Sequence, residues 1–218
     1  LSSSSAASDV YKRQLLYNHS RILMRNNFFN FTVLLLLMSF MAKAEPTEGR
    51  DYDIIPSGLL EGKAITEVFG YWCPACMSFE STAAQLKEQR PDVVFVQIPA
   101  GNEVFARLFY TIKALGLGNE AHLKVYTDYQ LLRERFSNNQ DIEAFAKRHG
   151  YDAEKFMNVY SSFGIGIKAM NALRKVRELS SAGVMEGVPS IYINGRYKFK
   201  RSADVQNNIN NMLSLYDG

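Results

Sequence analysis

Cysteine and histidine are scarce in this sequence. Its 218 residues contain two cysteines and three histidines, and only His122 and His149 lie beyond residue 44. A structural zinc site takes four nitrogen or sulfur ligands, usually from two cysteine pairs or from one pair with closely spaced histidines. The two histidines do not have such a spacing, so the sequence predicts no metal site.

Long runs of one charge are also missing. The chain has 25 Lys and Arg against 22 Asp and Glu, a formal net charge of +3. Residues 1–44 hold five of the basic and one of the acidic residues, which leaves 20 and 21 in the remainder, a net charge of −1. Nucleic-acid-binding proteins concentrate positive charge in a patch or stripe. The sequence therefore does not predict nucleic-acid binding.

The first 44 residues are not expected to belong to the folded protein. Residues 4–14 resemble a translated sequencing adapter, so we interpret 1–23 as adapter or upstream translation. Residues 24–44 have the pattern of a cleavable signal peptide, with Arg25, an apolar run and a small-x-small ending at Ala44. The alternative, a membrane anchor, is weaker because the apolar run is shorter than the ~20 residues of a spanning helix. We expect an exported chain that begins at Glu45.

Apolar periodicity beyond residue 44 predicts an α/β domain interrupted by helices. Strands are expected over 63–70 and 93–98, and a hairpin over 190–199 turns at Asn194-Gly195. Helices are expected after the first strand, throughout 101–183 and from about Asp204. We therefore expect a sheet domain built from residues 45–100 and 184–218, with a helical domain inserted over 101–183.

The two cysteines, Cys73 and Cys76, lie in the stretch F-G-Y-W-C-P-A-C. A passive crosslink is a weak interpretation, because closing so short a loop removes little entropy from the unfolded chain. Pro74 suits the first turn of a helix, which places Cys73 at the helix N-terminus, where free N–H groups and the helix dipole stabilise a thiolate. Cys76 lies one turn later on the apolar face. The pattern predicts a redox pair in which Cys73 reacts with substrate and Cys76 resolves.

A second feature, Gly187-Val188-Pro189-Ser190, precedes the hairpin. Taken alone, Pro189 fits an ordinary trans turn equally well. Together, F-G-Y-W-C-P-A-C followed by F-E, and G-V-P before a strand-Asn-Gly-strand hairpin, resemble the DsbA family of periplasmic thiol–disulfide oxidoreductases. The resemblance extends over nearly all of residues 49–215.

This resemblance implies a thioredoxin fold with an inserted helical domain. It implies that the redox-active disulfide of Cys73 and Cys76 is the reactive group and that no separate cofactor is needed. Pro189 would be a cis-proline, and the backbone of Val188 would pair with an extended substrate peptide. Valine at this position favours the oxidase branch, since the resemblance associates threonine with the isomerases.

The resemblance also assigns two buried acids. Glu67 would lie beneath the active site and assist proton transfer from Cys76, whereas the residues alone allow an exposed strand position. Glu80 matches a family acid near the centre. The family often has a basic residue where this chain has Gln97, so the remainder of that charge network is not predicted.

The active-site helix departs from the family pattern at Ala75. The best-known DsbA proteins have histidine there, which helps to stabilise the thiolate of the first cysteine. Alanine neither donates a hydrogen bond nor carries charge, so we expect a less oxidising disulfide than in those relatives. Tyr71 and Trp72 have two interpretations, as part of the substrate surface or as aromatic core.

The predicted function is disulfide donation to unfolded exported proteins with free thiols, in the periplasm. The resemblance implies a quinone-linked membrane partner of the DsbB type as reoxidant, and we expect a monomer. One alternative is a reductase or isomerase, although too few residues precede the first strand for an N-terminal dimerisation domain. Another is a periplasmic peptide-binding or chaperone module with incidental thiols.

Overall fold

The computed structural model describes residues 45–218, so the expected adapter segment and signal peptide lie outside the described residues. The strands are β1 (Tyr52–Ile54), β2 (Ile65–Phe69), β3 (Phe95–Pro99), β4 (Ser190–Ile193) and β5 (Tyr197–Phe199). The helices are α2 (Pro74–Gln89), α3 (Glu103–Ala114), α4 (Gly118–Tyr126), a π-helical turn η1 (Thr127–Leu131), α5 (Asn139–Arg148), α6 (Ala153–Tyr160), α7 (Phe163–Ser181) and α8 (Val205–Asp217).

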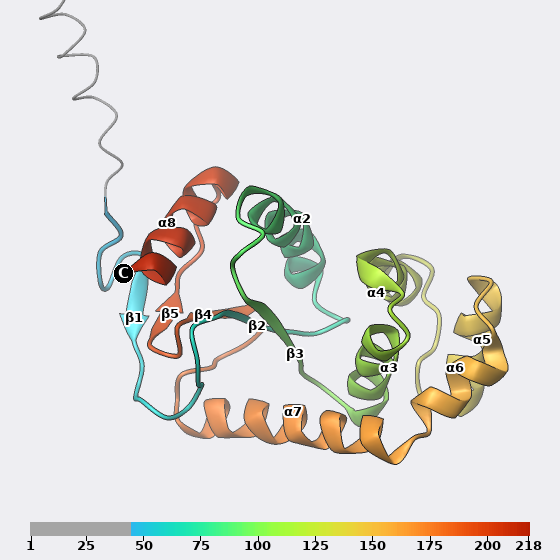
Figure 1. The fold of residues 1–218 in the computed structure, drawn as a ribbon. Coiled ribbons are helices and arrows are strands. Elements are labelled where there is room, and N and C mark those ends of the chain that lie inside the picture. Colours follow the sequence, from blue (N-terminus) through green and yellow to red (C-terminus); the bar gives the residue numbers. More distant parts are fainter. Residues whose placement is uncertain (1–44) are drawn as a thin grey trace, which may run out of the picture. The chain divides into compact units, whose positions relative to one another are not determined.

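The five strands form one sheet in the order β1-β5-β4-β2-β3 (Figure 1). β2 and β3 are parallel, whereas the other neighbours are antiparallel. A parallel pair needs a crossover connection, which α2 supplies. The β4–β5 hairpin turns at Asn194 and Gly195 with φ of 53° and 63°. Both angles are positive, as the Asn-Gly turn requires, so the predicted hairpin is confirmed.

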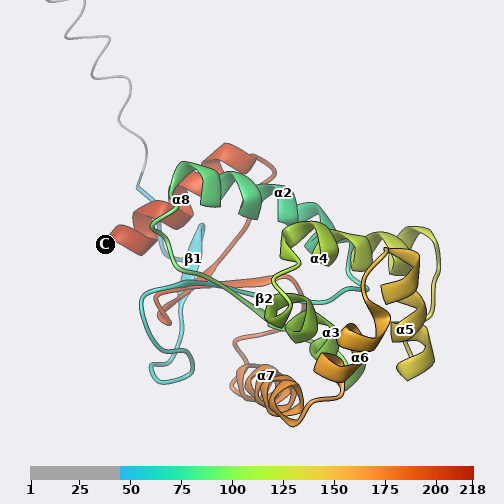
Figure 2. The ribbon, with the colours of Figure 1, turned by 45° about the vertical axis from the view of Figure 1, so that its right-hand side comes forward.

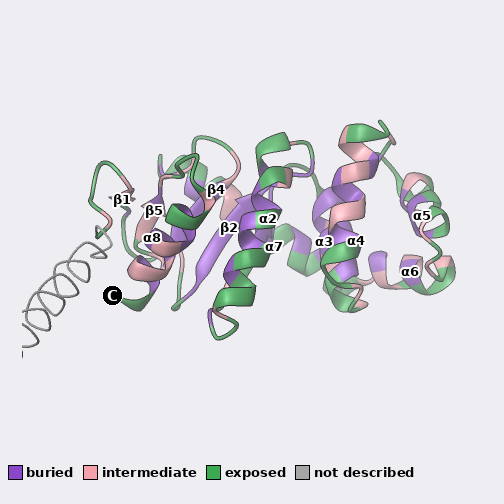
Figure 3. Ribbon diagram, turned by 90° about the horizontal axis from the view of Figure 1, so that it is seen from above, coloured by how far each residue is buried: buried purple, intermediate pink, exposed green. Residues whose placement is uncertain are grey.

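Helices cover both faces of the sheet. α2 and α8 lie on one face and α7 on the other (Figures 1 and 2). All five residues of β2 are buried, as expected of a central strand that is covered on both faces. Figure 3 shows the same pattern, with buried residues where the helices face the sheet and exposed residues on their outer sides.

Helices α3 to α7 lie between β3 and β4 in the chain, where the sequence predicts helices. Asp152 caps α6 by accepting a hydrogen bond from the N–H of Lys155 at 3.0 Å. The strand expected over 93–98 is shifted and runs over Phe95–Pro99. The sequence reasoning missed β1, and within the expected helical block it did not delimit α4 or η1. The short helix α4 has no side-chain N-cap, which removes the usual starting signal.

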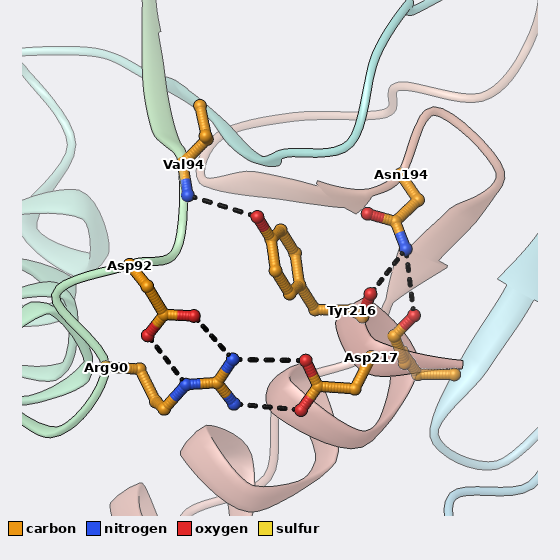
Figure 4. Close-up of polar contacts among 7 residues, drawn as sticks. Arg90, Asp92, Val94, Asn194, Tyr216 and Asp217 are labelled. Atoms are coloured by element: carbon orange, nitrogen blue, oxygen red, sulfur yellow. Dashed lines mark hydrogen bonds and ion pairs between the residues drawn. The ribbon is translucent and has the colours of Figure 1, made fainter.

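Polar contacts hold the end of α8 against the sheet (Figure 4). The Arg90 guanidinium lies 2.8 Å from carboxylate oxygens of both Asp92 and Asp217. The N–H of Val94 donates to the hydroxyl of Tyr216 at 3.3 Å. The side-chain amide of Asn194 donates to the last carbonyls of α8, which have no partner within the helix.

No helix of residues 45–218 is long and apolar enough to cross a bilayer.

Candidate active site

Cys73 lies at the start of α2, as the sequence predicts. Its backbone is extended, and its Sγ accepts a hydrogen bond from the N–H of Cys76 at 3.4 Å, so Cys73 is the N-cap of the helix. Pro74 occupies the first helical turn. Both cysteines are free thiols; Cys73 is partly exposed and Cys76 is fully buried. The predicted asymmetry between an outer and an inner sulfur is confirmed.

The loop before β4 meets the start of α2. β2 and β4 are antiparallel with Val68 opposite Ser190, so the end of β2 lies beside the beginning of β4. The thiol of Cys73 donates to the carbonyl of Val188 at 3.1 Å, across 115 positions of sequence. The Val188–Pro189 peptide bond is cis, as the resemblance implies, rather than the ordinary trans bond of the alternative.

Cys76 is buried in an aromatic cluster that joins the end of β2 to the inserted helices. Burial raises the pKa of the Cys76 thiol well above its usual value, and the neighbouring Cys73 and the charge of Glu67 raise it further. A buried thiol of this kind ionises only with help from a proton acceptor. The ionisation of the Cys76 thiol therefore depends on nearby groups that can exchange a proton with it.

Glu67 is the candidate for the acid that exchanges a proton with Cys76. It lies in the middle of β2 and is fully buried, so the expected buried acid is confirmed over an exposed strand position. The pKa of Glu67 is raised to about 8, mainly by burial and then by the charge of Glu80, although a hydrogen bond from Gln97 lowers it. An acid that titrates in this range exchanges its proton near neutral pH, which is what general acid–base assistance requires.

Gln97 links the two buried acids. Its Nε2 donates to Oε2 of Glu67 at 3.0 Å and to Oε1 of Glu80 at 2.9 Å. Glu67 and Gln97 are opposite each other in the parallel β2–β3 pair, and Glu80 reaches them from α2. A neutral amide thus occupies the place of the family's basic residue and bridges the two carboxyl groups.

His122 extends this network, and the sequence reasoning missed it. Its Nε2 lies 3.0 Å from Oε1 of Glu80, and its Nδ1 lies 2.7 Å from the hydroxyl of Tyr71. His122 is carried by α4, whose bounds within the helical block the sequence did not predict, and a lone histidine has no motif that marks it. Only the packing of α4 against the end of β2 brings it to the carboxyl groups.

The interpretation of Tyr71 as a substrate-surface residue is corrected by the structure. Its side chain is fully buried and its hydroxyl is bound to His122, so it belongs to the aromatic core. Trp72, in contrast, is 39% exposed. Its ring lies over Gly70 and Gly101, where a Cβ atom would approach ring atoms to 2.6 and 2.3 Å. Glycine at both positions therefore leaves room for the Trp72 ring.

The remaining active-site helix residues lie at the surface. Ala75 is exposed in the first turn of α2 and offers no polar side-chain atom to Cys73. In residues 45–218, no group of three His, Cys, Asp or Glu side chains is arranged to hold a metal ion.

Comparison with known proteins gives a consistent result. No protein-family model matches the chain. It is 31% identical over 173 residues to the thiol:disulfide interchange protein DsbA of Pseudomonas aeruginosa, covering 75% of this chain and 80% of that protein. It is 29% identical to the thiol:disulfide interchange protein DsbL of Escherichia coli, over 76% of this chain and 85% of that protein.

Solved structures show the same relationship. A variant of Pseudomonas aeruginosa DsbA superposes with a TM-score of 0.66 at 27% identity, over 79% of this chain and 97% of that one. These similarities confirm the predicted fold, a thioredoxin fold with a helical insertion. The extent and identity of the sequence match, with paired thiols at a helix start beside a cis-proline, show that the chain belongs to the DsbA family of thiol:disulfide interchange proteins.

Proposed function

We propose that this protein is a periplasmic oxidase that donates the disulfide of Cys73 and Cys76 to exported proteins. The observation that carries the proposal is the geometry of Cys73. Its sulfur is partly exposed at the N-terminus of α2 and lies 3.1 Å from the carbonyl of Val188, while its partner is buried one turn below. One sulfur is thus open to attack, and the other is protected from it.

The reaction follows from this asymmetry. A substrate thiolate attacks Sγ of Cys73, the bond between the two enzyme sulfurs breaks, and Cys76 leaves with the electron pair. Cys76 then takes a proton, for which the buried Glu67 is the proposed donor. A second substrate thiolate attacks the substrate sulfur of the mixed disulfide and releases Cys73 as a thiolate. The substrate loses two electrons, and the enzyme gains them.

Substrate contact is assigned to the surface around the exposed sulfur. We infer that the backbone of Val188 pairs with an extended peptide and that Trp72 packs against it. The cis-proline at 189 and the position of Val188 beside Cys73 support this role. Pro74 and Ala75 set the helix start, and Glu80 acts through the buried network.

The wider setting belongs to the same proposal. A quinone-linked membrane partner of the DsbB type would reoxidise the two thiols, and no separate cofactor is required. We also propose that the protein is a monomer and that residues 101–183 form an inserted helical domain. β3 ends at Pro99 and β4 begins at Ser190, with α3 to α7 between them, which supports these boundaries.

Cysteine variants test the activity. The oxidised protein is mixed with a reduced, unfolded substrate that has two thiols, and disulfides are counted over time. Cys73→Ala should abolish donation, whereas Cys76→Ala should accumulate a mixed disulfide with substrate. Ser78→Ala, on the exposed side of the same helix, should donate at the normal rate. Normal donation by Cys73→Ala would instead support a binding module with incidental thiols.

Thiol trapping in the native compartment separates the oxidase from the reductase or isomerase. A mostly oxidised pair of cysteines is expected for the oxidase. A mostly reduced pair would contradict it and favour the other branch, which is kept reduced by a different partner.

A further inference from the structure

Two buried carboxyl groups face each other beneath the active site. Glu67 is fully buried, Glu80 is 3% exposed, and both accept a hydrogen bond from the same side-chain amide of Gln97. Two carboxylates that share so dry a site do not ionise together, because each charge disfavours the other and burial disfavours both. One proton is therefore retained by the pair near neutral pH, and the reaction depends on which acid holds it.

The hydrogen bonds around the two acids are unequal. Oε1 of Glu80 lies within bonding distance of two nitrogen atoms, Nε2 of Gln97 at 2.9 Å and Nε2 of His122 at 3.0 Å. Glu67 is bound only by Gln97. Each acid also has one oxygen without a hydrogen-bond partner among the described residues, Oε1 of Glu67 and Oε2 of Glu80, so the two acids differ in the contact with His122. Hydrogen bonds to the ionised form favour that form, so the acid with two donors is the better place for the charge.

Tyr71 favours one tautomer of the imidazole. Its hydroxyl lies 2.7 Å from Nδ1 of His122, and burial raises the pKa of Tyr71 well above its usual value, so the phenol keeps its proton. A hydroxyl that donates to Nδ1 places the hydrogen of a neutral imidazole on Nε2, where it points at Glu80. A doubly protonated imidazole donates from Nε2 as well.

Aromatic rings hold the imidazole in this position. Phe69, Tyr71, Phe109 and Tyr126 surround the ring of His122 with centroid distances of 5.0 to 5.5 Å and steep interplanar angles. His122 itself is 3% exposed. The ring cannot turn away from Glu80 without displacing this cluster, so its contact with the carboxyl group is a fixed feature of the fold.

We propose that His122 is a positioning residue: its Nε2–H holds the negative charge on Glu80 and so leaves the exchangeable proton on Glu67, the acid that serves Cys76. This inference rests on the proposed function, since it concerns the proton that Cys76 takes up when it leaves the disulfide. In the competing arrangement Nδ1 carries the hydrogen and Nε2 accepts from a protonated Glu80, which would leave Glu67 as the charged acid.

Two other charged groups near the network, Lys87 and Arg201, lower the pKa of Glu67, and both effects are smaller than that of burial. Lys87 and Lys113 also line a cavity of about 290 Å³ together with Gln97 and His122. The other titratable groups that face the network are Tyr71, Tyr126 and Cys76. Among all of these, His122 is the group that contacts one acid and not the other.

Carboxyl ¹³C NMR titration of the reduced protein tests the assignment. Glu67→Gln and Glu80→Gln identify the two resonances. In the wild type, Glu67 should titrate near pH 8. In His122→Leu the proton should move to Glu80, and Glu67 should titrate at least one pH unit lower, a tenfold change in its acid dissociation constant. The pH profile of disulfide donation should move in the same direction.

Two further variants make the test specific. His122→Gln can keep an N–H directed at Glu80 and should leave Glu67 titrating near pH 8. His149→Leu is the matched control, because His149 also lies against a buried carboxylate, 2.9 Å from Asp128, but outside this network. It should leave both resonances unchanged. A shift in His149→Leu, or in His122→Gln as large as that in His122→Leu, would overturn the proposal.

Should His122→Leu not fold, Tyr71→Phe gives the same information. It removes the hydroxyl that holds the imidazole hydrogen on Nε2, so Glu67 should again titrate at lower pH. A Glu67 that titrates near pH 8 in whichever of His122→Leu and Tyr71→Phe folds would overturn the proposal. The titration uses no substrate, so it can fail while the cysteine variants behave as an oxidase requires, and the two results remain separate.

Discussion

Replacing Glu67 with glutamine should make the protein more stable as the pH rises. Glutamine has nearly the shape of the protonated acid and never ionises, so it keeps the buried state of β2 free of charge. The pKa of Glu67 rises from 4.5 to about 8 in the folded protein, mainly through burial. A raised folded-state pKa means that stability is fully present below pH 4.5 and is lost as the pH climbs through 8.

The size of the effect follows from the two pKa values. The interval from 4.5 to about 8 is about 3.5 pH units, and each unit corresponds to about 1.4 kcal/mol. Relative to the variant, the wild type should lose about 3 kcal/mol by pH 7 and about 5 kcal/mol above pH 8. Below pH 4.5 the two proteins should differ by a small amount that does not change with pH.

Urea unfolding of both reduced proteins between pH 4 and 9 measures this difference directly. Glu143→Gln, an exposed change on α5, is the control and should show no comparable growth with pH. A constant difference between wild type and Glu67→Gln across the range would refute the reasoning, since it would mean that Glu67 ionises in the fold as readily as in the unfolded chain.

Three further perturbations have defined outcomes. Ala75→His should stabilise the Cys73 thiolate and shift the equilibrium constant with glutathione at least tenfold, about 30 mV, toward a more oxidising disulfide; an unchanged constant would contradict the interpretation of Ala75. Gly101→Ala should cost about 1–3 kcal/mol of unfolding free energy and change the fluorescence of Trp72, the single tryptophan, because the new Cβ would approach its ring to 2.3 Å at a φ of +93°. Gly183→Ala, at a φ of +71° with open space around it, should lose stability with unchanged fluorescence. Asp152→Ala should lower the unfolding free energy by about 1 kcal/mol through the lost cap of α6, whereas Asp152→Asn should retain most of it; equal losses in the two variants would argue against capping.

Most of the site could be predicted because its signals are local. Pro74 marks the start of a helix whatever surrounds it, which places Cys73 at the N-cap and Cys76 on the inner face. The Asn-Gly turn at 194–195 specifies the hairpin by its positive φ angles. The family resemblance added the cis-proline at 189 and the buried position of Glu67, which spacing alone left open.

The burial of Tyr71 and the exposure of Trp72 could not be predicted from local sequence signals. Tyr71 and Trp72 are adjacent aromatic residues, and the sequence allowed either to be core or surface. The structure separates them because Tyr71 finds a partner in His122, whereas Trp72 covers two glycines at the protein surface. The partner and one of the glycines, Gly101, come from segments far along the chain, so no window around residues 71–72 contains the deciding information.

Local sequence patterns specify two thiols at a helix start, a proline before a hairpin, and the alternation of strands and helices that builds an α/β sheet domain. The arrangement of protons beneath those thiols arises only when distant segments pack together. Gln97 bridges two acids, and His122 binds one of them, because β3 and α4 bring both side chains to the buried end of β2. The physical reason is that turns and caps are set by neighbouring residues, whereas the protonation of a buried acid depends on every group that packs around it.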